Sequence, residues 1–344
     1  MTDLAPPRLQ VQNLSTSFAT EGGRIQSVAD VSFAIRPGQT LALVGESGSG
    51  KSVTSLSLMG LHARSSQPQV GGQAWFVQRD GRRVDLLALP EPQHRALRGN
   101  EIAMVFQEPM TSLNPVLTVG EQVAESARLH LGLDRRAARA HALRMLELVE
   151  IPAARQRLDE YPHQLSGGMR QRVMIALAMA CHPTLLIADE PTTALDVTIQ
   201  TQILALMGRL QAETGMSLLF ITHNLGVVAQ YADRVAVMYA GRIVEEADVH
   251  TLFAQPQHPY TRGLLACLPG VARRQAAAAG QRPRLAAIAG QVASALAPPP
   301  GCAFAPRCPR REAACGAGMP PLQAAGERSV RCLHPHAQAL ELTP

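Results

Sequence analysis

Patterns typical of buried strands and of helices alternate along most of this chain. Short strands are predicted where apolar or alternating residues run together near the start of the chain, at 9–18, 27–35 and 41–45. Pro37 and Gly38 predict a turn before the last of these strands. The apolar spacing at 53–62 predicts a helix, and the stretch 76–87 predicts a hairpin.

The same alternation continues from residue 119 onward, with longer helical stretches. In 119–150 the apolar positions recur at helical spacing and place Ala137, Ala140, Leu143 and Leu146 on one helix face. Further along, apolar runs typical of buried strands alternate with helical stretches, at 184–190, 197–214, 217–223, 225–232 and 233–241. Buried strands alternating with helices indicate an α/β fold with a parallel sheet covered by helices.

Composition and charge narrow the class of protein. The chain has 344 residues, 46% of them hydrophobic and 17% charged, which suits two or three compact units and excludes general disorder. The net charge of +5 permits anionic partners, but an aromatic content of 3% supplies few stacking surfaces for nucleic acid. Neither a signal peptide nor a membrane-length apolar run stands out, so we expect a soluble, cytosolic chain that binds no nucleic acid.

Residues 45–52 read GESGSGKS and match the phosphate-binding pattern G-x-x-x-x-G-K-S between a predicted strand and a predicted helix. Glycines let backbone N–H groups turn toward a phosphate, and the helix N-terminus adds partial positive charge. Lys51 would neutralise phosphate oxygens, and the Ser52 hydroxyl would ligate Mg²⁺. The predicted ATP-binding residues of this segment are Gly45, Glu46, Ser47, Gly48, Ser49, Gly50, Lys51, Ser52 and Val53.

Two carboxylates follow the apolar run at 185–188. At the end of a buried strand Asp189 can hold Mg²⁺, and Glu190 can polarise a water that attacks the γ-phosphate. A strand that ends in Asp-Glu is weak evidence alone, but its pairing with the phosphate loop makes it strong. We therefore expect Glu190 to be the catalytic base.

Residues 165–172, LSGGMRQR, resemble the signature sequence of ABC-type ATPases. The resemblance implies a P-loop NTPase fold with an ABC-type nucleotide-binding domain and a helical subdomain at about 100–170. It also implies that the signature opens a helix and binds ATP held by a second subunit, so that two ATPs lie between two subunits. The signature residues are Leu165, Ser166, Gly167, Gly168 and Met169, the last standing where Gln is commoner.

Three more positions match this family one at a time, and a fourth departs from it. Gln107 corresponds to a glutamine that contacts Mg²⁺ and nucleotide and links the site to the transport subunits. His223 corresponds to a catalytic histidine that bonds the γ-phosphate, and Asp196 to a residue that contacts the opposite subunit. Ile25 stands where the family usually stacks an aromatic ring on adenine, so we expect apolar contact there without stacking.

Two segments resemble the oligopeptide/dipeptide importer branch of ABC transporters. They are 106–122, around the glutamine, and 257–270, QHPYTRGLLACLPG. This resemblance implies an ABC ATPase domain at 1–255 and a small C-terminal domain of the oligopeptide-transporter type, carrying a four-cysteine motif, at 256–344. It also implies a peripheral subunit at the cytoplasmic face of the inner membrane. The implied partners are a second homologous ATPase, forming a heterodimer, two membrane permeases and an external solute-binding protein.

Four of the six cysteines lie near the C-terminus: Cys302, Cys308, Cys315 and Cys332. Structural disulfides are not expected in a reducing cytosol, and four gathered thiols suit a metal centre. Their spacing fits the C-x₂₋₄-C pairs of structural zinc poorly and suits an iron–sulfur cluster better. The importer subunits that this chain resembles carry the same pattern with a 4Fe–4S cluster, which we expect here, while zinc and unmetallated thiols remain open.

Two rival functions remain. The first is an ATPase subunit for nickel or another solute in the same branch, which the four-cysteine tail argues against. The second is a soluble ABC ATPase that acts on nucleic acid. The short interval between the phosphate loop and the signature, and the single nucleotide unit, argue against this second rival.

Overall fold

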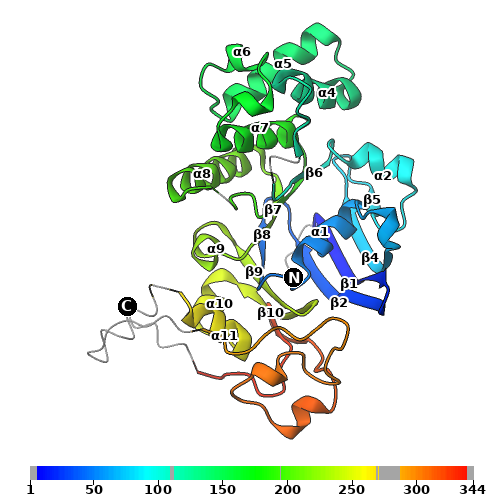
Figure 1. Ribbon diagram of the computed structural model, residues 1–344, viewed down its shortest axis with the longest axis vertical. Helices are drawn as coiled ribbons and strands as arrows, with labels where there is room; N and C mark the ends of the chain where they lie inside the picture. Colours follow the sequence, from blue (N-terminus) through cyan, green and yellow to red (C-terminus); the bar gives the residue numbers. More distant parts are fainter. Residues whose placement is uncertain (1–5, 109–111, 194, 269, 271–286, 339–344) are drawn as a thin grey trace. The chain divides into compact units, whose positions relative to one another are not determined.

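The computed structural model describes residues 6–108, 112–193, 195–268, 270 and 287–338 (Figure 1). Residues 273–284, RRQAAAAGQRPR, have a composition typical of a linker and lie outside the described residues. Contacts divide the chain into two compact units. Unit one is Met1–Gln10, Ala34–Thr40 and Ala74–Ile221, and unit two is Val11–Phe33, Leu41–Gln73 and Thr222–Pro344. The predicted boundary between residues 255 and 256 stays a prediction.

Unit one contains three parallel strands, β6 (Ile102–Val105), β7 (Leu185–Asp189) and β8 (Ser217–Thr222). In register, Val105 lies opposite Ala188, and Asp189 lies opposite Ile221. Every residue of the three strands is buried, which explains why their sequences are nearly unbroken apolar runs. The strands predicted at 184–190 and 217–223 are therefore confirmed.

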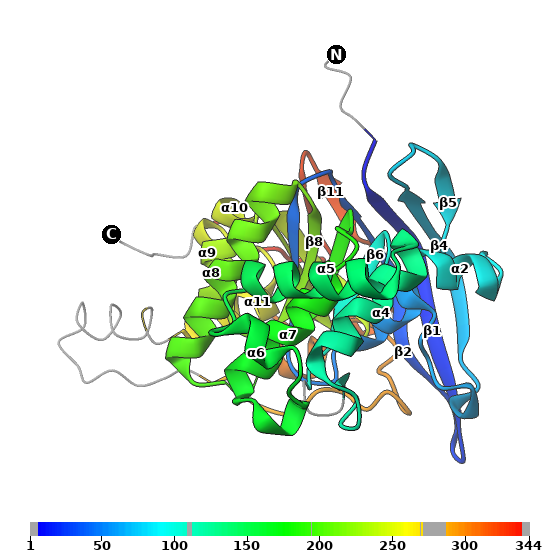
Figure 2. The same cartoon turned by 90° about the horizontal axis from the view of Figure 1, so that it is seen from above.

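A group of helices makes up the rest of unit one, together with the predicted hairpin at 76–87, formed by the end of β4 (Gln69–Val77) and β5 (Arg83–Asp85). The helices are α2 (Glu91–Leu97), α4 (Val119–Leu131), α5 (Arg135–Leu148), α6 (Ala154–Arg157), α7 (Gly167–Met179) and α8 (Val197–Thr214). Helices α4, α5 and α7 pack against one another (Figures 1 and 2). Side chains of Thr118 and Asp134 accept N–H groups at the starts of α4 and α5, which fixes where these helices begin.

The face predicted for α5 is partly wrong. Leu146 is buried as predicted, whereas Ala137 and Leu143 are half-buried and Ala140 is exposed. The buried residues are Ala138, His141, Ala142, Met145 and Leu146, which follow the helical spacing of three and four residues. The predicted positions recur strictly every third residue and therefore drift around the helix. His141 is the polar member of the buried face. Its Nε2 lies 2.7 Å from the carbonyl oxygen of Ala180 at the end of α7, so its buried ring has a hydrogen-bond partner.

Unit two holds the N-terminal strands β1 (Leu9–Thr20), β2 (Gly23–Ile35) and β3 (Thr40–Val44), which confirm the strands predicted near the start. Strand β3 pairs parallel with β9 (Arg234–Tyr239), and the sheet continues antiparallel through β10 (Arg242–Asp248), β12 (Arg328–Val330) and β11 (Gln323–Ala325). The helices of this unit are α1 (Lys51–Met59), α9 (Leu225–Tyr231), α10 (Val249–Ala254) and α11 (Pro259–Ala266). No helix among the described residues is long and apolar enough to span a membrane.

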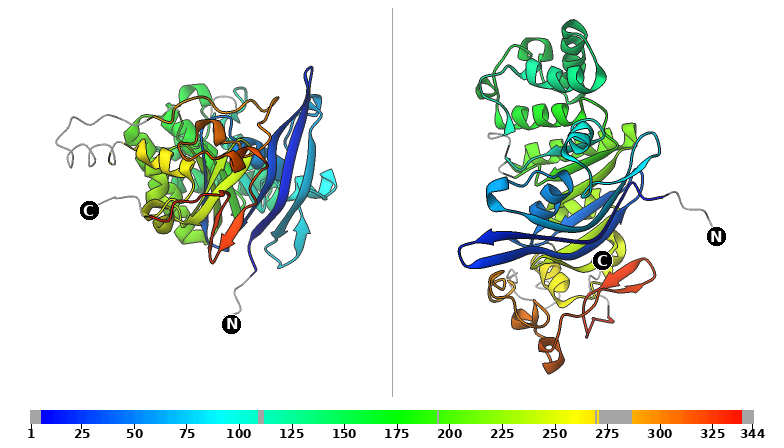
Figure 3. Two further views of the ribbon diagram at one scale, coloured as in Figure 1. Left: turned by 90° about the horizontal axis from the view of Figure 1, so that it is seen from below. Right: turned by 90° about the vertical axis from the view of Figure 1, so that its right-hand side faces the viewer.

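The C-terminal segment of unit two packs into the same core as these strands. Phe304 is 2% exposed, and its ring centroid lies 5.2 Å from that of Tyr239 and 5.4 Å from that of Tyr260. Two short 3₁₀ turns follow Phe304, η3 (Ala305–Arg307) and η4 (Ala313–Gly316). Figures 1 and 3 show this orange and red segment alongside α10, α11 and β10. The chain around Phe304 is thus anchored in the core of unit two by aromatic packing.

Candidate nucleotide-binding site

The phosphate loop predicted at 45–52 lies in unit two between β3 and α1. Gly50 occupies the cap position of α1 at φ +100°, and a Cβ there would lie 2.5 Å from the carbonyl oxygen of Ser27. A Cβ on Gly45 would lie 2.2 Å from the carbonyl oxygen of Met238. Glycine is therefore required at both positions by the close approach of neighbouring backbone.

Lys51 is the first residue of α1 and is 5% exposed. Its Nζ donates to the carbonyl oxygens of Gly45, at 2.8 Å, and Glu46, at 3.0 Å. The ammonium group is thus held inside the loop, where a phosphate would meet it together with the N–H groups of the helix N-terminus. This geometry suits the binding of a nucleoside triphosphate.

The carboxylates predicted for catalysis lie in unit one at the end of β7. Asp189 is 4% exposed and is the last residue of the strand, and Glu190 follows it at φ +45°. Such a φ is uncommon for a residue with a side chain, and it is held here by a hydrogen bond from the Glu190 N–H to the carbonyl oxygen of Ile221, at 2.9 Å. This strained backbone conformation turns the chain at Glu190 away from the direction of β7. Backbone strain of this kind is typical of functional sites.

The Glu190 carboxylate is oriented by two side chains of unit one. Its Oε2 accepts a hydrogen bond from Oγ1 of Thr193, at 2.9 Å, and another from Nε2 of Gln107, at 3.3 Å. Gln107 was predicted at the site from the sequence, whereas Thr193 was not. A hydroxyl three residues after a carboxylate, in a turn, is the local signal that would have indicated it.

The signature residues open helix α7 of unit one, as predicted. Ser166 is the N-cap, and its Oγ accepts the N–H of Met169 at 3.3 Å. Asp196 caps α8 in the same way, through Ile199 at 3.0 Å. A Cβ on Gly168 would lie 2.9 Å from the side chain of Ile199, so the two helix starts pack side by side.

Two more of the predicted site residues, His223 and Ile25, lie in unit two. His223 follows β8 and is exposed, and Asn224 after it caps α9. Ile25 lies on β2 and is half-buried. Contact of Ile25 with adenine and of His223 with a γ-phosphate, the roles of Ser52 and Asp189 toward Mg²⁺ and the intersubunit role of Asp196 stay predictions.

The four C-terminal cysteines line one small cavity in unit two: Cys302, Cys308, Cys315 and Cys332. All are free thiols. Burial raises the pKa of Cys302 and Cys308 above the ordinary value and that of Cys332 to about 11, and negative charge on a neighbouring thiol of the group adds to each shift. In the described part of the chain, no three His, Cys, Asp or Glu side chains are placed to hold a single metal ion.

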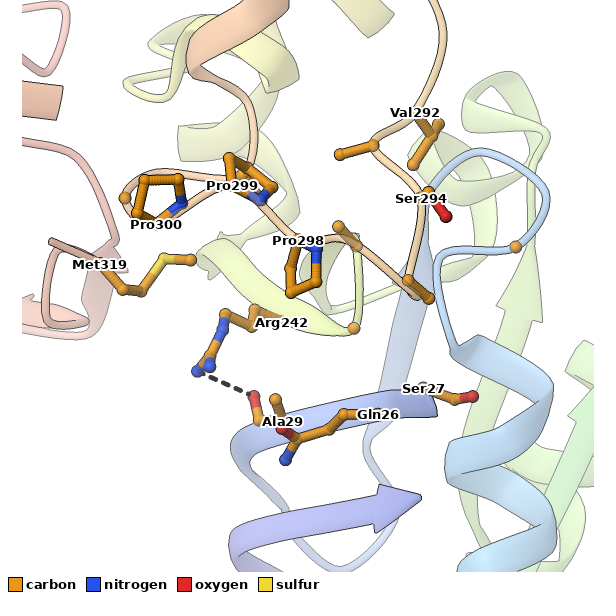
Figure 4. A pocket seen from close by; sticks show the side chains of 17 residues that line it. Gln26, Ser27, Ala29, Arg242, Val292, Ser294, Pro298, Pro299, Pro300 and Met319 are labelled. Atoms are coloured by element: carbon orange, nitrogen blue, oxygen red, sulfur yellow. Dashed lines mark hydrogen bonds between the residues drawn. The ribbon is translucent and has the colours of Figure 1, made fainter. Parts of the chain in front are cut away.

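A second cavity, of about 250 Å³, lies in unit two between β2, the turn from β9 to β10, and residues 292–301 (Figure 4). Gly48 of the phosphate loop and Pro298 of the C-terminal segment both line it. Arg242 borders it and donates to the carbonyl oxygen of Ala29 at 3.4 Å. The C-terminal segment therefore shares a cavity with the phosphate loop.

Family models match two parts of the chain. Residues 28–193 match the model of the ABC transporter, and residues 244–315 match that of the oligopeptide/dipeptide transporter, C-terminal region. Among solved structures, the chain is similar to the dimeric, post-hydrolysis ATP-binding cassette MJ0796 bound to ADP and Pi. The TM-score is 0.62 and the identity 27%, covering 70% of this chain and 98% of that one. The expected ABC ATPase cassette fold is confirmed.

Two curated relatives are similar at higher identity. One is named as a peptide import ATP-binding protein of Brucella abortus (strain 2308) and is 53% identical over 329 residues, covering 95% of this chain and 97% of that protein. The other is the glutathione import ATP-binding protein GsiA of Pectobacterium atrosepticum, 59% identical over 263 residues, or 76% of this chain and 42% of that protein. With its phosphate loop, signature helix and C-terminal region, this chain belongs to the ABC transporter family, as an ATP-binding protein of the oligopeptide/dipeptide branch.

Proposed function

We propose that this chain hydrolyses ATP to drive the import of dipeptides and oligopeptides through a membrane transporter. The observation that carries the proposal is the match of residues 244–315 to the C-terminal region of oligopeptide and dipeptide transporters. Relatives named for the import of peptides and of glutathione, itself a short peptide, support it.

In the proposed reaction, the phosphate loop holds ATP by its N–H groups and by Lys51. Glu190 accepts a proton from the attacking water, and His223 bonds the γ-phosphate. The oxygen donors of Ser52, Gln107 and Asp189 fit Mg²⁺, a hard cation that prefers oxygen ligands. When bound, the ion would neutralise charge on the phosphates.

Two copies of the ATPase fold would be needed for one complete site, because Leu165–Met169 would bind the ATP of the partner subunit. The dimeric state of the similar cassette supports this arrangement. We propose a second homologous ATPase as the partner, docked with this chain on two permeases at the cytoplasmic face of the inner membrane. An external solute-binding protein would deliver the peptide.

We further propose that the small C-terminal domain holds a 4Fe–4S cluster on Cys302, Cys308, Cys315 and Cys332. The donor set fits the group in kind and number, since four thiolates are its usual ligands. The four thiols line one small cavity, which supports a shared occupant. Iron, sulfide and zinc analysis of anaerobically purified protein tests this: about four irons and four sulfides per chain support it, and one zinc or no metal overturns it.

Uptake by the native host tests the substrate. Deleting the gene should confer resistance to toxic dipeptides and oligopeptides, and the native gene should restore sensitivity. The Lys51→Ala gene should fail to restore it, which separates ATP-driven uptake from mere presence of the subunit. Unchanged peptide uptake in the deletion strain would overturn the proposal, and loss of nickel uptake instead would assign the chain to the nickel branch.

A further inference from the structure

The C-terminal region holds Glu46 of the phosphate loop from two sides. The Glu46 N–H donates to the phenol oxygen of Tyr260, on α11, at 2.9 Å. The Glu46 carboxylate accepts two hydrogen bonds from the guanidinium of Arg307, at 2.7 Å and 3.0 Å. Backbone and side chain of this loop residue are therefore both fixed by residues more than 200 positions later in the chain.

Arg307 has no freedom to leave this position. It is 5% exposed at the side chain, and its Nε and Nη2 donate to the carbonyl oxygens of Ala289, at 3.0 Å, and Ile288, at 3.2 Å. Its guanidinium also lies within 5.9 Å of the ring centroids of Tyr239 and Phe304. Because the planar guanidinium serves several fixed acceptors at once, lysine cannot reproduce it.

Arg307 holds Glu46, and the position of Glu46 determines where the Lys51 ammonium lies. Glu46 is one of the two residues whose carbonyl oxygens accept from the Lys51 ammonium, and the other, Gly45, directly precedes it. The N–H of Ser49 also donates to the Glu46 carbonyl oxygen, at 3.2 Å, closing the turn of the loop. A shift of Glu46 would thus displace both the ammonium and the curl of the backbone that receives phosphate.

The segment that carries Arg307 also forms a wall of the cysteine cavity. Cys302 and Cys308 lie at the two ends of this segment and line the cavity, and Phe304 between them packs in the core. The Cys302 N–H donates to the carbonyl oxygen of Cys315 at 2.8 Å. Residues 302–308 therefore touch the phosphate loop at Arg307 and the cysteine cavity at both ends.

We propose that Arg307 is a positioning residue for ATP binding: acting through Glu46, it holds the phosphate loop in its binding conformation and makes the affinity for ATP depend on segment 302–308. The proposal rests on ATP binding by this family and not on any metal in the cysteine cavity.

Steady-state ATPase measurements on the full chain test the proposal. Arg307→Ala should raise KM for ATP by about 5- to 30-fold with kcat changed less than about twofold, since a buried charged hydrogen bond that shapes the binding loop is lost. Arg307→Lys should not restore KM. Arg311→Ala, which removes an exposed arginine four residues after Arg307, is the matched control and should behave as the native chain.

Two further measurements separate positioning from folding. Tyr260→Phe removes only the oxygen that accepts the Glu46 N–H and keeps the ring, and it should raise KM by about 3- to 10-fold. Arg307→Ala and Glu46→Gln should not add in the double variant, because each breaks the same pair. Unchanged KM in both Arg307→Ala and Tyr260→Phe, or a fall of kcat at constant KM, overturns the proposal. If the four thiols of Arg307→Ala become exposed to a thiol reagent, the folding of that variant is disturbed. In that case the KM of Tyr260→Phe alone tests the proposal.

Discussion

Nε2 of Gln107 donates a hydrogen bond to Oε2 of Glu190 over 3.3 Å, although 83 positions separate the two residues in the chain. The parallel pairing of β6 and β7, with Val105 opposite Ala188, brings together the loops that follow these strands. The same carboxylate oxygen accepts from Thr193. Glu190 is therefore preorganised by the sheet and by its own turn, as the proposed base of a hydrolysis reaction would need to be.

Replacing that carboxylate by its amide should separate binding from chemistry. Glu190→Gln should lower kcat by roughly 10²- to 10⁴-fold, because the base is lost, while the affinity for ATP is kept. Single-turnover hydrolysis and equilibrium ATP binding measure the two effects. Lys51→Ala is the contrasting variant and should weaken binding itself. Hydrolysis at the native rate by Glu190→Gln would show that another group is the base.

Thr193 should affect kcat only through its hydrogen bond to Glu190. Thr193→Val removes one hydrogen bond to the carboxylate and should lower kcat about fivefold, the equivalent of about 1 kcal/mol, with little effect on KM. Thr193→Ser keeps the hydroxyl and should retain most of the native kcat. If Thr193→Val keeps the native kcat while Thr193→Ser loses activity, the methyl packing of Thr193 matters and its hydrogen bond does not.

The parts of the site that the sequence could predict are those written in contiguous residues. The phosphate loop and the N-cap of α7 each follow from a short segment, because helix starts and tight turns are decided by local backbone requirements. Gln107, by contrast, was identified by resemblance and not from its own neighbours. Its bond to Glu190 depends on strand pairing, which no local pattern encodes.

Two short strands, the contacts of Glu46 and the buried face of α5 could not be predicted from the sequence. Strands β11 and β12 have three residues each, too few for an alternating pattern to be recognised. The contacts of Glu46 with Tyr260 and Arg307 cross 214 and 261 positions, so only the folded chain reveals them. On α5, the buried face includes His141, a polar residue paired to a carbonyl, which a pattern of apolar residues does not include.

Ser166 has two roles that a pair of variants can separate. As the N-cap of α7 it accepts a backbone N–H, and Ser166→Ala should destabilise the chain by about 1 kcal/mol. Ser166→Asp keeps a cap but places a carboxylate where the proposed signature meets the partner's γ-phosphate. It should therefore keep the unfolding midpoint and lose most ATP hydrolysis. Native hydrolysis by Ser166→Asp would remove Ser166 from the proposed signature contact.

His258 should make the stability of unit two depend on pH. The side chain is 1% exposed, and its Nδ1 accepts the N–H of Tyr260 at 3.1 Å, capping α11. Burial lowers the pKa of His258 to about 3, and the nearby His336 adds to the shift. In the unfolded chain the pKa is about 6.5, so between these values the unfolded chain binds a proton that the folded chain does not.

It follows that this contribution is fully present above about pH 6.5 and is lost as the pH falls, by up to about 1.4 kcal/mol per pH unit. His258→Asn keeps a capping acceptor without a titrating ring, so its stability should fall less steeply. Urea unfolding of both proteins between about pH 5 and pH 7.5 measures the difference. Other groups titrate alike in the two proteins. Parallel curves of unfolding free energy against pH would therefore mean that His258 takes up a proton in the folded state, and that its burial does not lower its pKa as its contacts indicate.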